Sequence, residues 1–382
     1  MYIFRQISNI ITSQLSKFPV LAVTGPRQSG KTTMLKEIFS AYRYISLEDP
    51  DIRSFAMDDP VGFLNEYSSK VIFDEVQRVP QLFSYIQSRV DASGQMGQFI
   101  LSGSQNFHLI ERITQTLAGR VALFKLLPLD FSELKAASIF DPSYTKTLIR
   151  GFYPAIFDRD IDPVIFYANY VQTYIEKDVT ELLNIKDLRA FRTFLGLCAT
   201  RSGQLLNISG LANDCNISQP TAKSWLSILE SSYIIFLLQP YHENFNKRLV
   251  KTAKLYFYDS GLLSYLLGIR SSEELVENRL KGNLFENMIV AEFQKQNYHM
   301  YLHREYYFWQ DSNSHEVDIL LKTNSGFDIY EIKATETIKP SLFEKMNYFE
   351  ELAKPAKVNK TLIYGGNKDQ KRSNYKISSW MP

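Results

Sequence analysis

Short apolar runs alternate with helix-like segments along the first third of the chain. Runs of this kind predict buried strands at residues 20–23, 71–73, 99–101 and 121–124. Strands that alternate with helices are typical of an α/β sheet, so we expect an α/β fold for residues 1–130.

From residue 131 onward the alternation stops. Aromatic residues recur at helical spacing over 163–188, which predicts a helix whose aromatic side chains belong to a core. Residues 208–212 and 219–229 predict two short helices, with Ser218 as N-cap and Pro220 in the first turn of the second. Strands expected at 233–239 and 254–258 would complete a winged helix-turn-helix. Such a fold either reads a DNA groove or contacts protein, and the candidate groove contacts are Gln219, Thr221, Lys223 and Ser224.

A second constellation lies near the end of the chain. An apolar-periodic helix at 283–296 carries Glu286, the strand at 317–321 carries Asp318, and the strand at 329–333 carries Glu331 and Lys333. Residues i and i+2 of a strand share a face and lie roughly 7 Å apart, so Glu331 and Lys333 point the same way. A hairpin brings Asp318 onto that face. The simpler interpretation is an exposed hairpin with an ion pair of little energetic value.

Composition restricts these alternatives only modestly. The 382 residues suffice for two to three domains, and 45% hydrophobic content supports packed cores. A formal charge of +2 does not mark a nucleic-acid binder, so phosphate contacts would need local patches such as the basic runs at 247–254 and 354–376. Two cysteines without metal-ligand spacing, no membrane-length apolar run and no signal-peptide core predict a cytoplasmic protein without a membrane partner.

The most specific motif is GPRQSGKT at residues 25–32, between the first predicted strand and a helix. Gly25 and Gly30 permit a tight turn whose N–H groups surround phosphates, Lys31 reaches the β- and γ-phosphates, and the Thr32 hydroxyl ligates Mg²⁺. ATP and Mg²⁺ are therefore the expected cofactors. The residues expected to bind them are Gly25, Pro26, Arg27, Gln28, Ser29, Gly30, Lys31, Thr32, Thr33, Asp74 and Ser104.

Two later strands end in residues that suit hydrolysis. Asp74 would hold Mg²⁺, and Glu75 is placed to act as general base on the attacking water. The strand at 99–101 runs into Ser102 and Ser104, either of which could sense the γ-phosphate, because ligands of open α/β sheets bind at carboxyl ends of strands. A plain serine-glycine turn is the alternative.

Arg120 lies between a helical stretch, 109–118, and the strand at 121–124. With the phosphate loop, the Asp-Glu strand and the serine-ended strand, this order resembles an AAA+ ATPase. The resemblance implies that Arg120 is a finger that completes a neighbouring subunit's site, and hence a homo-oligomer. Arg112 is the second candidate, and a structural salt bridge is the alternative for either.

The C-terminal pattern resembles the PD-(D/E)XK nuclease fold. That resemblance implies Mg²⁺ ligands at Glu286, Asp318 and Glu331 and a catalytic lysine at Lys333; Val317 replaces the proline of the family's name. Over nearly its full length the chain resembles prokaryotic AAA+ ATPases with a C-terminal domain of unknown function. The stretches that carry this resemblance are GPRQSGKTT, VIFDEVQ, LSGSQNF, LAGRVAL, YVQTYIEKDV and LYFYDSGLLSYLLG.

The combined prediction is a four-part chain. It comprises a P-loop AAA+ core (1–130), a helical lid (131–200), a winged helix (201–270) and a nuclease-like α/β domain (271–382). We expect an ATPase coupled to a DNA-binding, metal-dependent DNA-cleaving module. The alternative is a nucleotide-dependent switch or protein-remodelling ATPase whose nuclease-like domain only binds DNA or protein.

Overall fold

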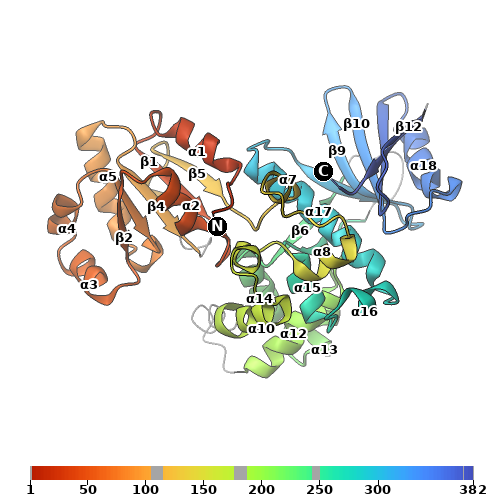
Figure 1. Ribbon diagram of the computed structural model, residues 1–382, viewed down its shortest axis with the longest axis horizontal. Coiled ribbons are helices and arrows are strands. Elements are labelled where there is room, and N and C mark those ends of the chain that lie inside the picture. The colour runs from red at the N-terminus through yellow and green to blue at the C-terminus, as the bar shows by residue number, and fades with distance from the viewer. Residues whose placement is uncertain (1, 105–114, 176–186, 243–249, 373, 382) are drawn as a thin grey trace.

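The computed structural model describes residues 2–104, 115–175, 187–242, 250–372 and 374–381. The N-terminal sheet and its helices form one lobe, on the left of Figure 1, and the C-terminal sheet lies at the upper right with helices of the middle segment below it. None of the described helices is long and apolar enough to cross a membrane.

The N-terminal lobe is a five-stranded parallel sheet in the order β2-β3-β4-β1-β5. The four predicted strands are confirmed, and β2 is added at the edge. Continuous burial of β1, β3 and β4 reflects helices on both faces. The strands are β1 (Val20–Thr24), β2 (Arg43–Ser46), β3 (Val71–Asp74), β4 (Phe99–Gly103) and β5 (Val121–Lys125). The helices are α1 (Ile7–Gln14), α2 (Lys31–Ile38), α3 (Pro50–Asp58), α4 (Pro60–Glu66), α5 (Leu82–Ser93) and the 3₁₀ turn η1 (Val76–Arg78).

The middle segment is helical. Of the helix expected over 163–188, α10 passes into a π-helical turn, η2, and residues 176–186 lie outside the described residues. The expected end is wrong, because Asp187 is a non-helical N-cap and Leu188 begins a separate helix, α12. Ser218 caps α14 by accepting a hydrogen bond from the Thr221 N–H, as predicted. The elements are α7 (Phe131–Ala136), α8 (Tyr144–Arg150), α9 (Pro154–Asp158), α10 (Pro163–Tyr170), η2 (Val171–Ile175), α12 (Leu188–Thr200), α13 (Ile208–Asp214), α14 (Gln219–Ser231), α15 (Ser260–Leu266) and α16 (Ser272–Val276).

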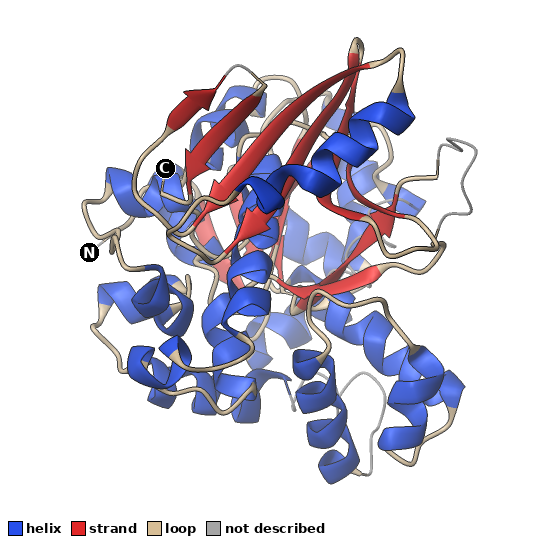
Figure 2. Ribbon diagram, turned by 90° about the vertical axis from the view of Figure 1, so that its right-hand side faces the viewer, coloured by secondary structure: helices blue, strands red, loops and turns tan. Residues whose placement is uncertain are grey.

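The C-terminal sheet has eight strands in the order β12-β13-β11-β10-β9-β8-β6-β7. Helix α18 crosses the side of this sheet that faces the viewer in Figure 2 and buries Met346 and Phe349 there. The elements are β6 (Ile235–Pro240), β7 (Lys254–Phe257), α17 (Lys281–His299), β8 (Tyr306–Gln310), β9 (Glu316–Thr323), β10 (Gly326–Lys333), η3 (Pro340–Phe343), α18 (Glu344–Ala353), β11 (Lys357–Tyr364), β12 (Gln370–Arg372) and β13 (Tyr375–Ser379).

The hairpin of β6 and β7, expected as the wing, is continuous with this sheet. Strand β6 pairs in parallel with β8, where Gln239 lies opposite Tyr307. One hydrophobic cluster runs from Ile3 through the middle helices to Trp380. The predicted range 201–270 therefore shares its sheet and its core with the residues that follow it.

Candidate functional site

The phosphate loop connects β1 to α2 through backbone conformations that few residues adopt. Gly25 and Gly30 have φ of 153° and 90°, and Gln28 is left-handed with φ of 64°. A Cβ atom at Gly25 would lie 2.0 Å from the Leu126 carbonyl oxygen. Glycine is therefore required at position 25 by space as well as by conformation.

Lys31 and Thr32 begin α2 and point back toward the loop and the end of β3. The Lys31 Nζ donates to the carbonyl oxygens of Gly25 and Pro26 at 2.9 and 2.8 Å. The Thr32 hydroxyl donates to Asp74 Oδ2 at 2.8 Å. The structure thus brings together the lysine, hydroxyl and carboxylate that the motif predicted.

Tyr44 is a neighbour of this cluster that the motif did not reveal. Its hydroxyl, from β2, donates to the same Asp74 Oδ2 at 2.7 Å. Burial and the Asp74 charge raise the pKa of Tyr44 well above its ordinary value. The tyrosine therefore stays a neutral donor to Asp74 near neutral pH.

Glu75 follows Asp74 in a left-handed conformation, with φ of 53° and ψ of 41°. This conformation is strained for a non-glycine residue, and such strain is concentrated at functional sites. Ser104 Oγ donates to Glu75 Oε2 at 3.1 Å, and the Gln77 side-chain amide donates to the same oxygen. Burial raises the pKa of Glu75 above its ordinary value, partly offset by Lys31.

The two candidate serines occupy different places. Ser104 lies beyond the end of β4 and contacts Glu75, whereas Ser102 lies within β4, opposite Asp74 of β3. Ser102 is fully buried, and its hydroxyl has no hydrogen-bond partner in the described part of the chain. The geometry therefore favours Ser104 as the serine that reaches the cavity.

A cavity of about 410 Å³ opens over the loop. Beyond the predicted residues, its walls include side chains from the N-terminus, from β2 and from the middle segment. Sequence reasoning missed these side chains because no local motif marks them. They are Tyr2, Ile3, Arg5, Tyr44, Glu48, Pro154, Ala155, Asp158, Arg159 and Tyr174.

The aromatic residues of α10 and η2, expected only as core, also contact the phosphate loop. The Tyr170 hydroxyl donates to the Arg27 carbonyl oxygen at 3.3 Å, and Gln28 Nε2 donates to the Tyr174 hydroxyl at 2.7 Å. Tyr174 lies in the π-helical turn, a type of irregularity that is frequent at functional sites. The middle segment therefore closes one side of the loop.

Arg120 lies on the surface, away from the residues that line this cavity. Its guanidinium makes a two-pronged contact with Asp91 of α5, at 2.5 and 2.9 Å. This is the salt bridge that the sequence left open as an alternative. Arg112, the other finger candidate, lies outside the described residues, as does most of the helix expected at 109–118.

The four predicted C-terminal residues form a second cluster at the junction of α17, β9 and β10. Asp318 lies at its centre, and its Oδ2 accepts from the Ile332 N–H at 2.7 Å. Lys333 Nζ lies 3.3 Å from that oxygen and 2.6 Å from Glu331 Oε1. The other oxygen of Glu331, Oε2, is buried without a hydrogen-bond partner among the described residues.

Two members of this cluster were not predicted. Glu316 shares the face of β9 with Asp318, and oxygen atoms of Glu286, Glu316 and Asp318 lie within 4.8 Å of one another. Lys254 comes from β7, with Nζ 2.6 Å from Glu316 Oε1 and 3.8 Å from Glu286 Oε1. The expectation that Lys254 belongs to a basic surface run is wrong, because its side chain is only 4% exposed. Lys247 and Arg248 of that run lie outside the described residues.

The carboxyl groups of this cluster are strongly perturbed. Burial, followed by the charge of Asp318, raises the pKa of Glu286 to about 7 and that of Glu331 to about 8. Burial also acts on Asp318, but Lys333 and Lys254 hold its pKa below the ordinary value. Four carboxyl groups share two ammonium groups, so protons supply the remaining positive charge when no cation is bound.

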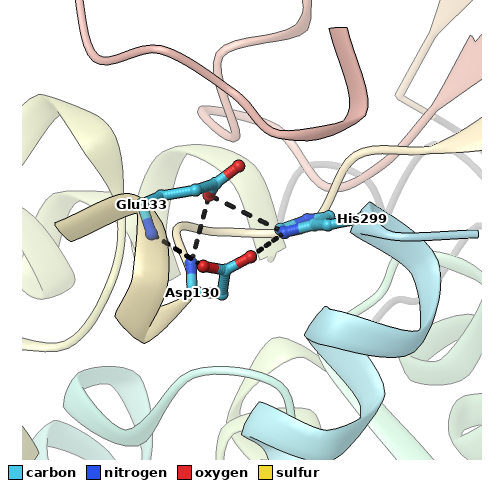
Figure 3. Close-up of side chains that lie close together, drawn as sticks. All are labelled: Asp130, Glu133 and His299. Carbon is cyan, nitrogen blue, oxygen red and sulfur yellow. Dashed lines mark hydrogen bonds and ion pairs between the residues drawn. The ribbon is translucent and has the colours of Figure 1, made fainter. Parts of the chain in front are cut away.

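A third cluster joins the end of the N-terminal lobe to the C-terminal helix α17 (Figure 3). His299 Nδ1 lies 2.7 Å from Asp130 Oδ2, and the Leu127 N–H donates to His299 Nε2, which assigns the ring proton to Nδ1. Arg5 bonds to Glu133 Oε1 at 3.0 Å and to the Ser29 carbonyl oxygen at 2.6 Å. Because both ring nitrogens and the arginine are committed to these bonds, this cluster is a structural joint and not a metal centre.

Comparisons with known protein families match three stretches of the chain. Residues 17–135 match a family described as AAA domain, and residues 141–273 and 281–381 match two families described as domains of unknown function. An uncharacterized protein of Mycobacterium tuberculosis is 27% identical over 335 residues, which cover 87% of this chain and 74% of the relative. An uncharacterized protein of Methanocaldococcus jannaschii is 23% identical, over 72% of this chain and 67% of its own.

Among solved structures, a Walker-type ATPase of Pyrococcus abyssi is similar over 68% of this chain and 94% of its own, at 14% identity and a TM-score of 0.47. RuvB of Thermotoga maritima is similar over 60% of this chain and 87% of its own, at 19% identity and a TM-score of 0.32. The AAA match and the phosphate loop within it identify residues 17–135 as a P-loop ATPase domain of the AAA class. Such a domain binds nucleotide, typically with Mg²⁺.

Proposed function

We propose that the protein hydrolyses ATP and that hydrolysis controls a metal-dependent, DNA-cleaving module at its C-terminus. The contact that carries the ATPase assignment is Ser104–Glu75, beside the Thr32–Asp74 bond. It places a buried carboxylate with a raised pKa next to a hydroxyl–carboxylate pair that suits Mg²⁺.

In the ATP reaction, the loop N–H groups and Lys31 bind the phosphates, with Thr32 and Asp74 as the ligands that would hold Mg²⁺. The bound ion would neutralise charge on the phosphate oxygens. Glu75 accepts the proton of the attacking water, and Ser104 and Gln77 hold its carboxylate in place. Lys31 exchanges its two carbonyl partners for phosphate oxygens when nucleotide enters.

Two variants test the ATPase assignment. Lys31→Ala should abolish nucleotide binding, measured with a fluorescent ATP analogue. Glu75→Gln should bind the analogue normally but hydrolyse ATP roughly 10²–10⁴-fold more slowly, because the general base is lost. Full turnover by Glu75→Gln would remove Glu75 from this role.

The proposal of phosphodiester cleavage is supported by the metal-binding atoms that the C-terminal cluster offers. Carboxylate oxygens are ligands that Mg²⁺ prefers, and Glu331 Oε2 is a buried oxygen that has no hydrogen-bond partner among the described residues. Asp318 and Glu331 would hold the ion, which would polarise a phosphoryl oxygen and activate water. Glu286, the third predicted ligand, lies 3.8 Å from the Lys254 ammonium group instead. Lys333 is 33% exposed and would contact the negatively charged phosphate.

A buried hydrogen bond joins the residue before the phosphate loop to the segment that leads toward the C-terminal cluster. Thr24, directly before the phosphate loop, bonds through its hydroxyl to that of Tyr233 at 2.7 Å. Tyr233 leads into β6, which pairs with β7, the strand that begins with Lys254. A shift of the loop on nucleotide binding would therefore reach the carboxylate cluster through one hairpin.

Cleavage is tested with full-length protein, Mg²⁺ or Mn²⁺, and single-stranded, duplex and branched DNA, with and without ATP. Wild type should nick at least one substrate, and Lys333→Ala should not. Lys339→Ala, a change to a nearby lysine outside the cluster, is the matched control and should cleave normally. If wild type and Lys333→Ala are equally inert on every substrate, the cleavage proposal fails.

One observation favours the alternative, a nucleotide-dependent switch whose C-terminal module only binds DNA or protein. Both lysines of the cluster are already paired with its carboxylates, an arrangement that is also stable without catalysis. In that case DNA should still stimulate ATP hydrolysis without being cut. Indifference of the ATPase rate to DNA would instead favour protein remodelling.

Subunit contacts are tested through Arg120. If Arg120 is a finger in a homo-oligomer, mixing Arg120→Ala with Lys31→Ala subunits should restore part of the ATPase activity, because intact loops then meet intact fingers. A monomeric wild type with normal turnover would exclude this role.

A further inference from the structure

Lys254 is a buried lysine that enters the C-terminal cluster from outside residues 271–382. It begins β7, and its ammonium group lies 5.3 Å from the centre of the Phe308 ring as well as 2.6 Å from Glu316 Oε1. Lysine is almost never buried unless its charge is paired. Its partners, Glu316 and Glu286, form a group of three close carboxylates together with Asp318.

Asp318 divides the cluster into two halves. We call Glu286, Glu316 and Lys254 the inner half, and Glu331 and Lys333 the outer half. The carboxylate oxygens of the inner half and of Asp318 lie within 4.8 Å of one another. Oxygen ligands about 2.1 Å from a Mg²⁺ ion lie roughly 3–4 Å apart, so this spacing is close to that of a cation site. The ammonium of Lys254 lies among these oxygens.

The two lysines differ in how easily they can leave. The Lys333 side chain is 33% exposed at the end of β10 and can turn into solvent when a metal ion approaches Asp318 and Glu331. The Lys254 side chain is 4% exposed. Its departure would require a movement of β7 and would leave Glu316 buried without its nearest cation.

We propose that Lys254 is a fixed cation that closes the inner half to divalent metal ions. The cluster then takes one ion, in the outer half between Asp318 and Glu331, and not the pair of ions about 4 Å apart that some phosphodiester-cleaving sites use. This inference rests on the proposed function only for the outer ion. The closure of the inner half is a separate property of Lys254.

The test counts Mn²⁺ ions bound to the full-length protein without nucleotide, from the electron paramagnetic resonance signal of free Mn²⁺. Lys254→Met should bind one ion more than wild type, because the inner carboxylates lose their cation. Glu331→Gln should bind one ion fewer than wild type. The double variant Lys254→Met/Glu331→Gln should match the wild-type count, with its ion in the inner half.

Two controls separate charge from shape. Lys254→Arg keeps a cation in place and should bind no additional ion, and Lys254→Met/Glu316→Gln lacks an inner ligand and should lose the gain. If Lys254→Met does not fold, as judged by circular dichroism, Lys254→Gln offers an amide donor to Glu316 and should show the same gain.

The outcomes for the two ideas are distinguishable. Equal ion counts for wild type and the folded Lys254→Met or Lys254→Gln variant would overturn the inference, whatever Glu331→Gln does. Equal counts for wild type and Glu331→Gln would overturn the outer metal site of the proposed function, and a gain in Lys254→Met would still support the closure of the inner half.

Discussion

Replacing Arg5 with methionine should be among the most destabilising single changes in the N-terminal lobe. The guanidinium is 2% exposed and bonds to Glu133 Oε1 at 3.0 Å and to the carbonyl oxygens of Ser29 and Leu127, both at 2.6 Å. Methionine fills a similar volume but removes every donor. The Glu133 side chain, which is fully buried, then keeps its carboxylate without a cation.

Removing one partner of a buried ion pair costs about 3–5 kcal/mol, because the other charge is left uncompensated. At about 2–4 °C per kcal/mol for a unit of 150–250 residues, the melting temperature should fall by roughly 6–20 °C. Arg43→Met is the matched control. Arg43 and Glu66 are separated by the same 3.0 Å, but their side chains are 56% and 55% exposed. Exposed pairs contribute about 0–1 kcal/mol, so this variant should melt near wild type.

Thermal melting of four proteins tests whether the uncompensated buried charge causes the destabilisation. The four are wild type, Arg5→Met, Glu133→Gln and the double variant. The double variant should be more stable than Arg5→Met, because it buries no unpaired charge. The KM for ATP should rise in Arg5→Met, since Ser29 loses the donor that holds its carbonyl oxygen. A fall in melting temperature no larger than that of Arg43→Met would refute the reasoning.

Three further predictions concern other parts of the protein. Burial raises the pKa of Asp130, but hydrogen bonds from the His299 ring, the Ser132 hydroxyl and the Glu133 N–H outweigh it and hold the value well below normal. The stabilisation that ionised Asp130 provides is therefore complete above the unfolded pKa of about 3.9 and is lost as the pH falls toward the folded pKa. The difference in free energy of unfolding between wild type and Asp130→Asn, measured with urea, should shrink below about pH 4. Gly25→Ala should abolish ATP binding in a fluorescent-nucleotide titration, because the new Cβ meets the Leu126 carbonyl. Arg120→Ala should leave the melting temperature unchanged; if Arg120 is a finger, ATP turnover should nevertheless fall roughly 10³-fold or more.

The phosphate loop was predictable because its geometry is encoded locally. Glycine at 25 and 30, a lysine and a threonine specify the turn wherever it occurs, and Asp74 and Glu75 follow a strand that its apolar run marks. The choice between Ser102 and Ser104 was not predictable. The two share a strand face, and only the pairing of β4 shows that Ser102 lies inside the sheet and Ser104 beyond its end.

The C-terminal cluster shows a similar limit. Glu316 could have been found, since it lies two residues before Asp318 and strand periodicity puts both on one face. Lys254 could not, because its neighbours are 32 and 62 residues away and meet it only through the packing of α17 on β7 and the pairing of β6 with β8. Arg5 likewise reaches Glu133 across 128 residues of chain. The local pattern of residue types predicts local backbone conformation, whereas these side-chain contacts arise only from tertiary packing.

The phosphate loop and the residue before it are hydrogen-bonded to three other parts of the chain. Tyr170 and Tyr174 bond to Arg27 and Gln28, Tyr233 bonds to the residue before the loop, and Arg5 ties Ser29 to the joint formed with His299. A loop that moved alone would break bonds in all three. Because packed interfaces favour a few discrete arrangements over continuous deformation, we infer that nucleotide binding shifts these parts together. Strand β6 begins two residues after Tyr233 and pairs with β7, whose first residue, Lys254, lies in the carboxylate cluster, so this hairpin is a route by which such a shift would reach the second site.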